Sequence, residues 1–157
     1  MYDFLEYTVA DAMTYRPVTV GPQATLAELE ARFEQHDFDC LPVCDQDGRM
    51  LGVVGKLDFL RAFAFGNETM LPRYDDIMQR PVESIMTRRP ITVSPDAPLT
   101  RVLQLMVETR HKSFPVLMGN LVLGMIARRD LLRALRRAAG QPARARMGRR
   151  SEPWTAT

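Results

Sequence analysis

The sequence contains one series of short motifs twice, in the same order. Met13-Thr14 returns as Met86-Thr87, and Pro17-Val18-Thr19-Val20 returns as Pro90-Ile91-Thr92-Val93, both at an offset of 73 residues. A duplication constrains the fold strongly, because both copies form the same supersecondary unit and shelter each other's apolar surface. We therefore expect a chain of 157 residues to fold as two related halves.

Both copies predict the same order of elements, β-α-β-β-α. Thr25-Leu26-Ala27-Glu28 has the form of a capping box, which indicates the start of a helix. Two apolar runs flank the turn residues Asp45 to Gly48 and indicate a hairpin. The elements predicted for the first copy are a helical entry at 9–13, a strand at 18–20, a helix from Leu26, strands at 40–44 and 50–54, and a helix at 58–65. The second copy ends with a predicted helix from Asp130 to about Ala138.

One such unit of about 60 residues buries too little surface to be stable by itself. We therefore predict an α/β (α+β) fold in which two β-α-β-β-α repeats pack about a pseudo-twofold axis. The predicted boundaries are 1–66 for the first repeat, 67–80 for a connector, 81–139 for the second repeat and 140–157 for a basic, flexible tail.

An acid follows the last strand of each copy. The stretch from Gly52 to Arg61 returns from Gly124 to Arg133, and each copy reads as a strand that runs into a helix with Asp58 or Asp130 in its first turn. Such a carboxylate can complement the positive end of its own helix. It can also accept hydrogen bonds from a ligand's hydroxyl groups.

The motif order resembles the cystathionine-β-synthase (CBS) domain. The resemblance rests on Met-Thr followed by Pro-h-T-V (h is an apolar residue), a strand that carries Pro-Val, and a final G-h-h-x-x-x-D-h-h, and it covers residues 8–138. Two such domains in tandem form a CBS pair, or Bateman module. The resemblance implies a regulatory module that binds AMP, ADP, ATP or S-adenosylmethionine in clefts between the repeats. It also implies a homodimer.

The resemblance assigns roles to individual residues. It places Asp58 and Asp130 at the ribose hydroxyls of a ligand, and it implies that the acid of one repeat shares a pocket with the first strand of the other. One predicted pocket contains Asp58, Arg89, Ser94, Lys112 and Ser113, and the other contains Asp130, Arg16, Gly21 and Cys40. Two further cations, Lys56 and Arg128, precede the acids by two residues. The first pocket is more basic and is the better candidate for a nucleotide.

One feature departs from the family pattern. The family often has Ser or Thr three residues before the acid, whereas this chain has Gly55 and Ala127. Glycine is a fair residue for a helix N-cap and alanine is a poor one. The loss of both hydroxyl groups favours an alternative in which the pockets are vestigial.

Several other classes of protein do not fit the sequence. The chain has no nucleophile elbow, P-loop or metal-ligand cluster, so we predict no catalysis and no required cofactor. Cys40 and Cys44 lie on one predicted strand, too far apart for a disulfide. No apolar run approaches the roughly 20 residues that cross a bilayer, and the acidic N-terminus lacks the features of a signal peptide. We therefore predict a cytoplasmic location and no membrane partner.

The favoured function is sensing of an adenine nucleotide or adenosyl compound, with transmission to an unknown partner protein through a homodimer. The alternative is a scaffold with empty clefts, held together by apolar helix residues such as Phe59, Phe63 and Phe65. A weaker alternative is nucleic-acid contact through the arginines of the tail, where residues 143–157 hold four Arg and one Glu. The arginines near the end of the last helix also offset its dipole, so a nucleic-acid partner is not favoured.

Overall fold

Each half of the molecule is completed by the Met-Thr segment of the other sequence repeat. The computed structural model describes residues 2–64 and 73–140. Within them, unit 1 combines the residues up to Val18 with those from Ile91 onward, and unit 2 runs from Thr19 to Pro90. The two compact units therefore do not coincide with the sequence repeats, whose boundaries stay a prediction about the duplication.

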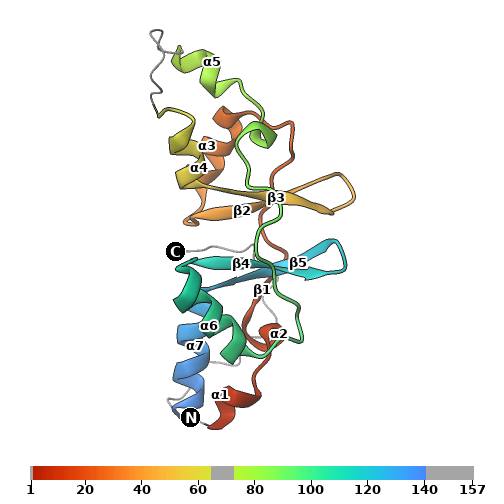
Figure 1. Cartoon of the computed structure of the whole chain (residues 1–157), viewed down its shortest axis with the longest axis vertical. Helices are drawn as coiled ribbons and strands as arrows, with labels where there is room; N and C mark the ends of the chain where they lie inside the picture. The colour runs from red at the N-terminus through yellow and green to blue at the C-terminus, as the bar shows by residue number, and fades with distance from the viewer. Residues whose placement is uncertain (1, 65–72, 141–157) are drawn as a thin grey trace. The chain divides into compact units, whose positions relative to one another are not determined.

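Unit 1 is a three-stranded antiparallel sheet with helices packed on it. The strands have the order β1-β5-β4, and α6 and α7 lie side by side with α1 at their end (Figure 1). The elements are α1 (Tyr2–Glu6), α2 (Val9–Ala12), β1 (Thr14–Tyr15), α6 (Leu99–Thr109), β4 (Ser113–Met118), β5 (Leu121–Ala127) and α7 (Arg128–Ala138). The core between the sheet and the helices contains Phe4, Val102, Phe114, Ile126 and Leu131, all almost fully buried.

Unit 2 repeats this plan with a shorter ladder. Strands β2 (Cys40–Cys44) and β3 (Met50–Gly55) form an antiparallel hairpin. A single bridge between Val53 and Thr87 takes the place that β1 has beside β5 in unit 1. The helices are α3 (Leu26–Gln35), α4 (Lys56–Arg61), α5 (Tyr74–Met78) and the 3-10 turn η1 (Val82–Ser84). Ring contacts of Phe33 with Phe59, of Phe59 with Phe63 and of Phe63 with Tyr74 join α3, α4, the turn after α4, and α5.

Two glycines make the exchanged segments possible. A side-chain carbon at Gly52 would lie 2.5 Å from the carbonyl oxygen of Thr87, and one at Gly124 would overlap the carbonyl oxygen of Thr14. Both glycines stand on the last strand of their unit, where the incoming backbone crosses. Glycine is needed at these positions because only a residue without Cβ allows so close an approach.

Most local predictions agree with the structure. The fold class is confirmed, both hairpins form, and the helix at Val9–Ala12 begins after Thr8 as expected. The strand predicted at 18–20 and its counterpart in the second copy, at 91–93, do not form ladders, because each segment contributes only one isolated parallel bridge: Val20 to Val43, and Val93 to Val116. Prolines at 17, 22, 90 and 95 flank these segments and cannot donate ladder hydrogen bonds.

The final helices begin two residues before the predicted acids, at Lys56 and Arg128. Within the predicted connector, Tyr74–Met78 forms a short helix. Phe65, the connector residues 67–72 and the tail from 141 lie outside the described residues. No helix among the described residues is long and apolar enough to cross a membrane. The pseudo-twofold axis stays a prediction.

The cap of α3 gives a first quantitative prediction. The Glu28 amide donates to Thr25 Oγ1 at 3.2 Å, and the Thr25 amide donates to Glu28 Oε2 at 3.0 Å. We expect Thr25→Ala to lower the free energy of unfolding by about 1 kcal/mol, because it leaves a helix N–H without its acceptor. Chemical denaturation would measure this loss, with Thr25→Ser as the matched control that keeps the hydroxyl. Equal stability of the two variants would contradict the role of this cap.

Candidate functional site: two carboxylate corners

The strand–helix corners β3–α4 and β5–α7 hold their acids in the same geometry. The Gly55 amide donates to Asp58 Oδ2 at 2.9 Å, and the Ala127 amide donates to Asp130 Oδ2 at 2.8 Å. The backbone angles of the two N-cap residues agree closely, with φ of −118° at Gly55 and −120° at Ala127. Each acid therefore accepts from the N-cap amide of its own helix, as the acid of a capping box does, whereas Gly55 and Ala127 have no side-chain acceptor for the amide at the third helical position.

The second carboxylate oxygen of each acid faces an arginine one turn further along. Arg61 lies 3.6 Å from Asp58 Oδ1, and Arg133 lies 3.9 Å from Asp130 Oδ1. The sequence prediction did not include these arginines. Their spacing of three residues from each acid is the available signal, because side chains three apart on a helix are neighbours.

The two corners differ in burial. The side chain of Asp58 is 15% exposed, whereas that of Asp130 is 5% exposed. Burial raises the pKa of Asp130 to about 6, and the Ala127 amide, Arg133 and Arg129 oppose that shift. A carboxylate oxygen can accept more than one hydrogen bond. The Asp58 carboxylate is therefore the one that a ligand hydroxyl reaches more readily.

Cys40 and Lys56 surround the Asp58 corner. A carbon placed on Gly55 would lie 3.7 Å from Asp58 Oδ2 and 3.9 Å from the Cys40 Cβ. Burial, followed by the charges of Asp58 and Asp39, raises the pKa of the Cys40 thiol to about 12. Cys40 and the buried Cys44 are both free thiols, and their raised pKa values keep them protonated. Lys56 Nζ lies 4.0 Å from Asp39 Oδ1.

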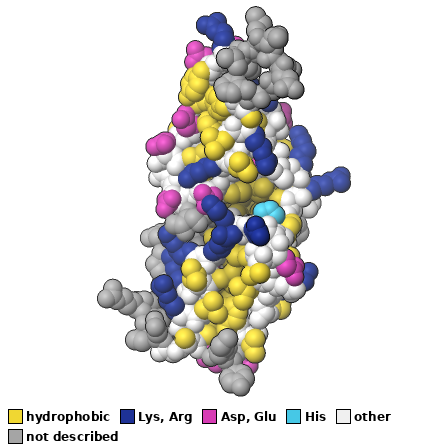
Figure 2. All heavy atoms as spheres, turned by 60° about the vertical axis from the view of Figure 1, so that its left-hand side comes forward, with side chains coloured by type: hydrophobic (Ala, Val, Ile, Leu, Met, Phe, Trp, Pro, Cys, Tyr) yellow, Lys and Arg dark blue, Asp and Glu magenta, His cyan; other side chains and the backbone are white. Residues whose placement is uncertain are grey.

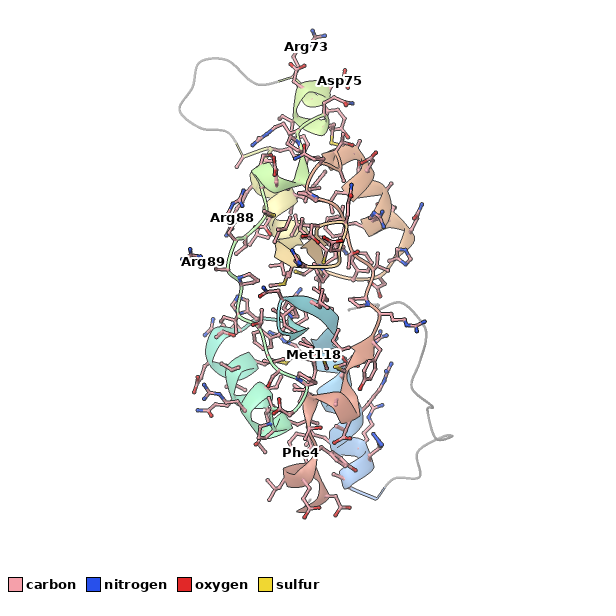
Figure 3. All side chains as sticks on the ribbon, turned by 90° about the vertical axis from the view of Figure 1, so that its right-hand side faces the viewer. Phe4, Arg73, Asp75, Arg88, Arg89 and Met118 are labelled. Carbon is pink, nitrogen blue, oxygen red and sulfur yellow. The ribbon has the colours of Figure 1, made fainter. Side chains whose placement is uncertain are left out.

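Arg16 and Arg89 occupy equivalent, unusual backbone positions. Both have φ of 53°, in the left-handed region that non-glycine residues rarely adopt. Both side chains are exposed, and Figure 3 shows Arg88 and Arg89 on the segment that leads out of unit 2. Such conformations cost on the order of 1–3 kcal/mol and concentrate at binding sites. Because the same backbone conformation occurs at the equivalent position of both copies, Arg16 and Arg89 are candidates for ligand contact.

The structure divides the predicted site residues between the units. Asp58, Lys56, Arg89, Gly21 and Cys40 belong to unit 2. The unit 1 members are Asp130, Arg128, Arg16, Ser94, Lys112 and Ser113. Each acid thus shares a unit with the arginine that the family pattern assigns to it. The predicted links of Asp58 to Ser94, Lys112 and Ser113, and of Asp130 to Gly21 and Cys40, join residues of different units and stay predictions.

Three predicted residues of unit 1 take part in specific hydrogen bonds: Arg128, Lys112 and Ser94. The Arg128 amide donates to the Lys112 carbonyl oxygen at 3.0 Å, and the Arg128 guanidinium donates to the Arg110 carbonyl oxygen at 2.8 Å. A hydrogen bond from the Ser94 side chain lowers the pKa of Asp96. In the part of the chain that the structure describes, no group of three or more His, Cys, Asp or Glu could hold a metal ion.

Comparison with known families decides the identity of the fold. The family model described as the CBS domain matches residues 9–65 and 82–137. The chain belongs to the CBS domain family. CBS domains are regulatory modules, and this chain contains two of them in tandem.

Several known proteins are similar to this chain over most of their length. The CBS domain-containing protein YhcV of Bacillus subtilis is 29% identical over 125 residues, which cover 79% of this chain and 82% of that protein. An uncharacterized conserved protein from Pyrococcus horikoshii superposes with a TM-score of 0.68 and 30% identity, covering 84% of this chain and 94% of that one. CBSX2, solved in complex with AMP, superposes with a TM-score of 0.72 and 26% identity, covering 85% of this chain and 98% of that one.

Proposed function

We propose that this CBS pair binds an adenosine-containing ligand, with the ribose hydroxyls at Asp58, and passes its occupancy to a partner protein. The observation that carries the proposal is the Asp58 corner. There a fixed, partly exposed carboxylate stands at a helix start, with one oxygen oriented by the Gly55 amide. An ionised carboxylate suits two neighbouring hydroxyl groups because it offers several acceptor positions and no donor.

The similarity to CBSX2 supports the ligand class, because that protein was solved with AMP. AMP, ADP, ATP and S-adenosylmethionine all contain the adenosine unit that the proposed site would recognise. Arg89, in the same unit as Asp58, would supply positive charge for a phosphate, and its exposed guanidinium and constrained backbone fit that role. Guanidinium groups bind phosphate oxygens well because their donors are arranged as a planar fork.

To pass ligand occupancy on to a partner protein, the chain needs a second conformation. A ligand shifts an equilibrium only by its difference in affinity for the two conformations. We propose that a homodimer of this chain provides those conformations and presents one of them to the regulated protein. The transmitted signal would then be the change in the dimer's conformational population on binding.

Asp58→Ala should weaken nucleotide binding at least about 10-fold, because it removes charge-assisted hydrogen bonds to the ligand. Isothermal titration calorimetry with AMP, ADP, ATP and S-adenosylmethionine would identify the ligand and measure the loss. For a nucleotide ligand, the sharper measurement compares AMP with its analogue that lacks the ribose 2′-hydroxyl. Wild type should discriminate between the two, and Asp58→Ala should not.

The matched control is Asp45→Ala, because Asp45 is an acid of the β2–β3 turn in the same unit whose carboxylate caps turn amides. This variant should bind AMP as the wild type does. Absence of heat with all four compounds would remove the proposal, and so would equal AMP affinity of Asp58→Ala and wild type.

A scaffold with empty pockets is the second candidate. The observation that favours it is that both oxygens of Asp58 and of Asp130 already face partners within the chain. Thermal unfolding separates the two functions, because a compound that binds only the folded form raises the unfolding midpoint. A midpoint unchanged by millimolar nucleotide would favour the scaffold. Nucleic-acid contact through the tail concerns residues outside the described part of the chain and stays a prediction.

A further inference from the structure

The Asp58 carboxylate faces an arginine of its own helix. The Gly55 amide donates to Oδ2 at 2.9 Å and fixes the carboxylate, while Oδ1 faces Arg61 Nη1 at 3.6 Å. A ribose diol that uses both carboxylate oxygens has to donate a hydrogen bond to Oδ1 as well. Such a ligand therefore meets Arg61 at the acceptor that it needs.

The pair between Arg61 and Asp58 is loose and open to solvent. Its separation of 3.6 Å exceeds the length of about 3 Å that N–H···O hydrogen bonds have. The side chain of Arg61 is 68% exposed, so its guanidinium is hydrated with or without Asp58 beside it. In Figure 2, Lys and Arg side chains, drawn dark blue, project from the surface of the molecule into solvent. Exposed pairs of this kind are weak, so a ligand can displace the guanidinium.

The equivalent pair in unit 1 is more enclosed. Arg133 Nη1 lies 3.9 Å from Asp130 Oδ1, and the Arg133 side chain is 40% exposed. The Asp130 side chain is itself buried, whereas that of Asp58 is half-buried. The same arrangement of an acid and an arginine three residues apart thus occurs in both units. Of the two copies, the one at Asp58 combines an accessible oxygen with an arginine that solvent surrounds.

We propose that Arg61 competes with the ribose hydroxyls for Asp58 Oδ1, which lowers the affinity of the site and makes that affinity rise with ionic strength. The inference rests on the proposed function and adds a regulatory residue to it. A bound ribose replaces the ion pair by a hydrogen bond from a hydroxyl group, and the freed guanidinium turns into water. Because dissolved ions screen an exposed pair, salt weakens the competitor and not an uncharged ligand.

The competition also makes Arg61 a specificity-determining residue. A ligand with a single hydroxyl group, placed at Oδ2, leaves the ion pair at Oδ1 intact. A ligand with two neighbouring hydroxyl groups has to break that pair, so Arg61 acts against the diol alone. Removal of Arg61 should therefore raise the affinity for the diol more than the affinity for the ligand with one hydroxyl group.

Adenosine is the probe for this competition, because it contains the ribose diol and carries no charge. Arg61→Met keeps the length of the side chain and removes its charge and its donors. Isothermal titration calorimetry at low salt should show that Arg61→Met binds adenosine about 2- to 5-fold more tightly than the wild type, the range expected for one exposed ion pair. Raising sodium chloride from about 0.02 M to about 0.5 M should tighten adenosine binding by the wild type and leave binding by Arg61→Met unchanged.

The analogues of adenosine that lack the 2′-hydroxyl or the 3′-hydroxyl locate the effect. One of them lacks the hydroxyl group that reaches Oδ1, and this analogue should bind Arg61→Met and the wild type equally. The other analogue keeps that hydroxyl group and should gain affinity as adenosine does. A change in the stability of α4 alone would alter the binding of all three compounds alike, so it could not produce this pattern.

Two further variants are matched controls. Arg61→Lys keeps a cation at the same position of α4 and should bind adenosine nearly as the wild type does, with affinity that rises with salt. Arg49→Met makes the same chemical change at an exposed position before β3, at the opposite end of that strand from the Asp58 corner. It should leave both the affinity for adenosine and its salt dependence unchanged.

Three outcomes would overturn the competition: equal adenosine affinity of Arg61→Met and the wild type, an equal gain for both deoxy analogues, or the same gain in Arg49→Met. A wild type that does not bind adenosine in any salt, with an Arg61→Met protein that does not bind it either, would overturn it too. In each of these cases, AMP binding that Asp58→Ala weakens would still leave the Asp58 site in place. Failure of the competition is therefore distinguishable from failure of the proposed function.

Discussion

Gly124→Ala should lower the free energy of unfolding by about 3 kcal/mol, near the upper end of the cost of overpacking a core. The added carbon would overlap the carbonyl oxygen of Thr14 and would lie 3.3 Å from the Met13 side chain. Backbone cannot move aside as a long side chain does, so β1 has to separate from β5. Chemical denaturation followed by circular dichroism would measure the loss. Gly52→Ala should behave similarly, because its added carbon would lie 2.5 Å from the Thr87 carbonyl oxygen.

Gly21→Ala is the matched control for both variants. A carbon at Gly21 meets no atom within 4 Å, and its backbone is not in the left-handed region. This variant should leave stability unchanged or raise it by up to about 1 kcal/mol, because alanine restricts the unfolded chain. A Gly124→Ala protein as stable as Gly21→Ala would show that the segment around Thr14 does not pack on β5 as described.

Asp130→Asn should stabilise the protein at neutral pH by up to about 3 kcal/mol, which follows from a pKa raised from 3.8 to about 6 in a side chain that is 5% exposed. The folded state holds the proton more tightly than the unfolded chain. The wild type is therefore most stable, relative to Asp130→Asn, below about pH 4. It loses that stability as pH rises to about 6, and the difference stays constant above that pH. Asparagine keeps an acceptor for the Ala127 amide and carries no charge into the buried site.

Denaturation curves of wild type and Asp130→Asn from pH 4 to pH 8 would measure this difference. Groups that titrate alike in both proteins cancel in the difference between the two free energies of unfolding, so that difference reports on Asp130. Asp130→Leu is the matched control that removes the acceptor, and it should be less stable than Asp130→Asn because it leaves the Ala127 amide unpaired. A stability difference that does not change with pH would contradict the description of Asp130 as a buried, destabilised carboxylate.

Asp58 and Asp130 show which properties of the site the sequence pattern predicts and which it does not. The duplicated stretch predicted an acid in the first turn of each final helix, and both acids are there. The pattern treats Asp58 and Asp130 alike. Their burial differs because residues distant in the sequence surround each corner. The sequence favours the Asp58 pocket only by its more basic predicted lining, whereas the difference in exposure between the two carboxylates comes from the tertiary structure.

The sequence by itself determined the duplication, both hairpins, the cap at Thr25 and the positions of the two acids, because each depends on interactions between residues close together in the chain. The tertiary structure alone decided which repeat completes which unit. It also decided that the segments at 18–20 and 91–93 form single bridges. These features depend on contacts between residues that are far apart in the sequence. The spacing of motifs along one strand or helix contains no information about such long-range contacts.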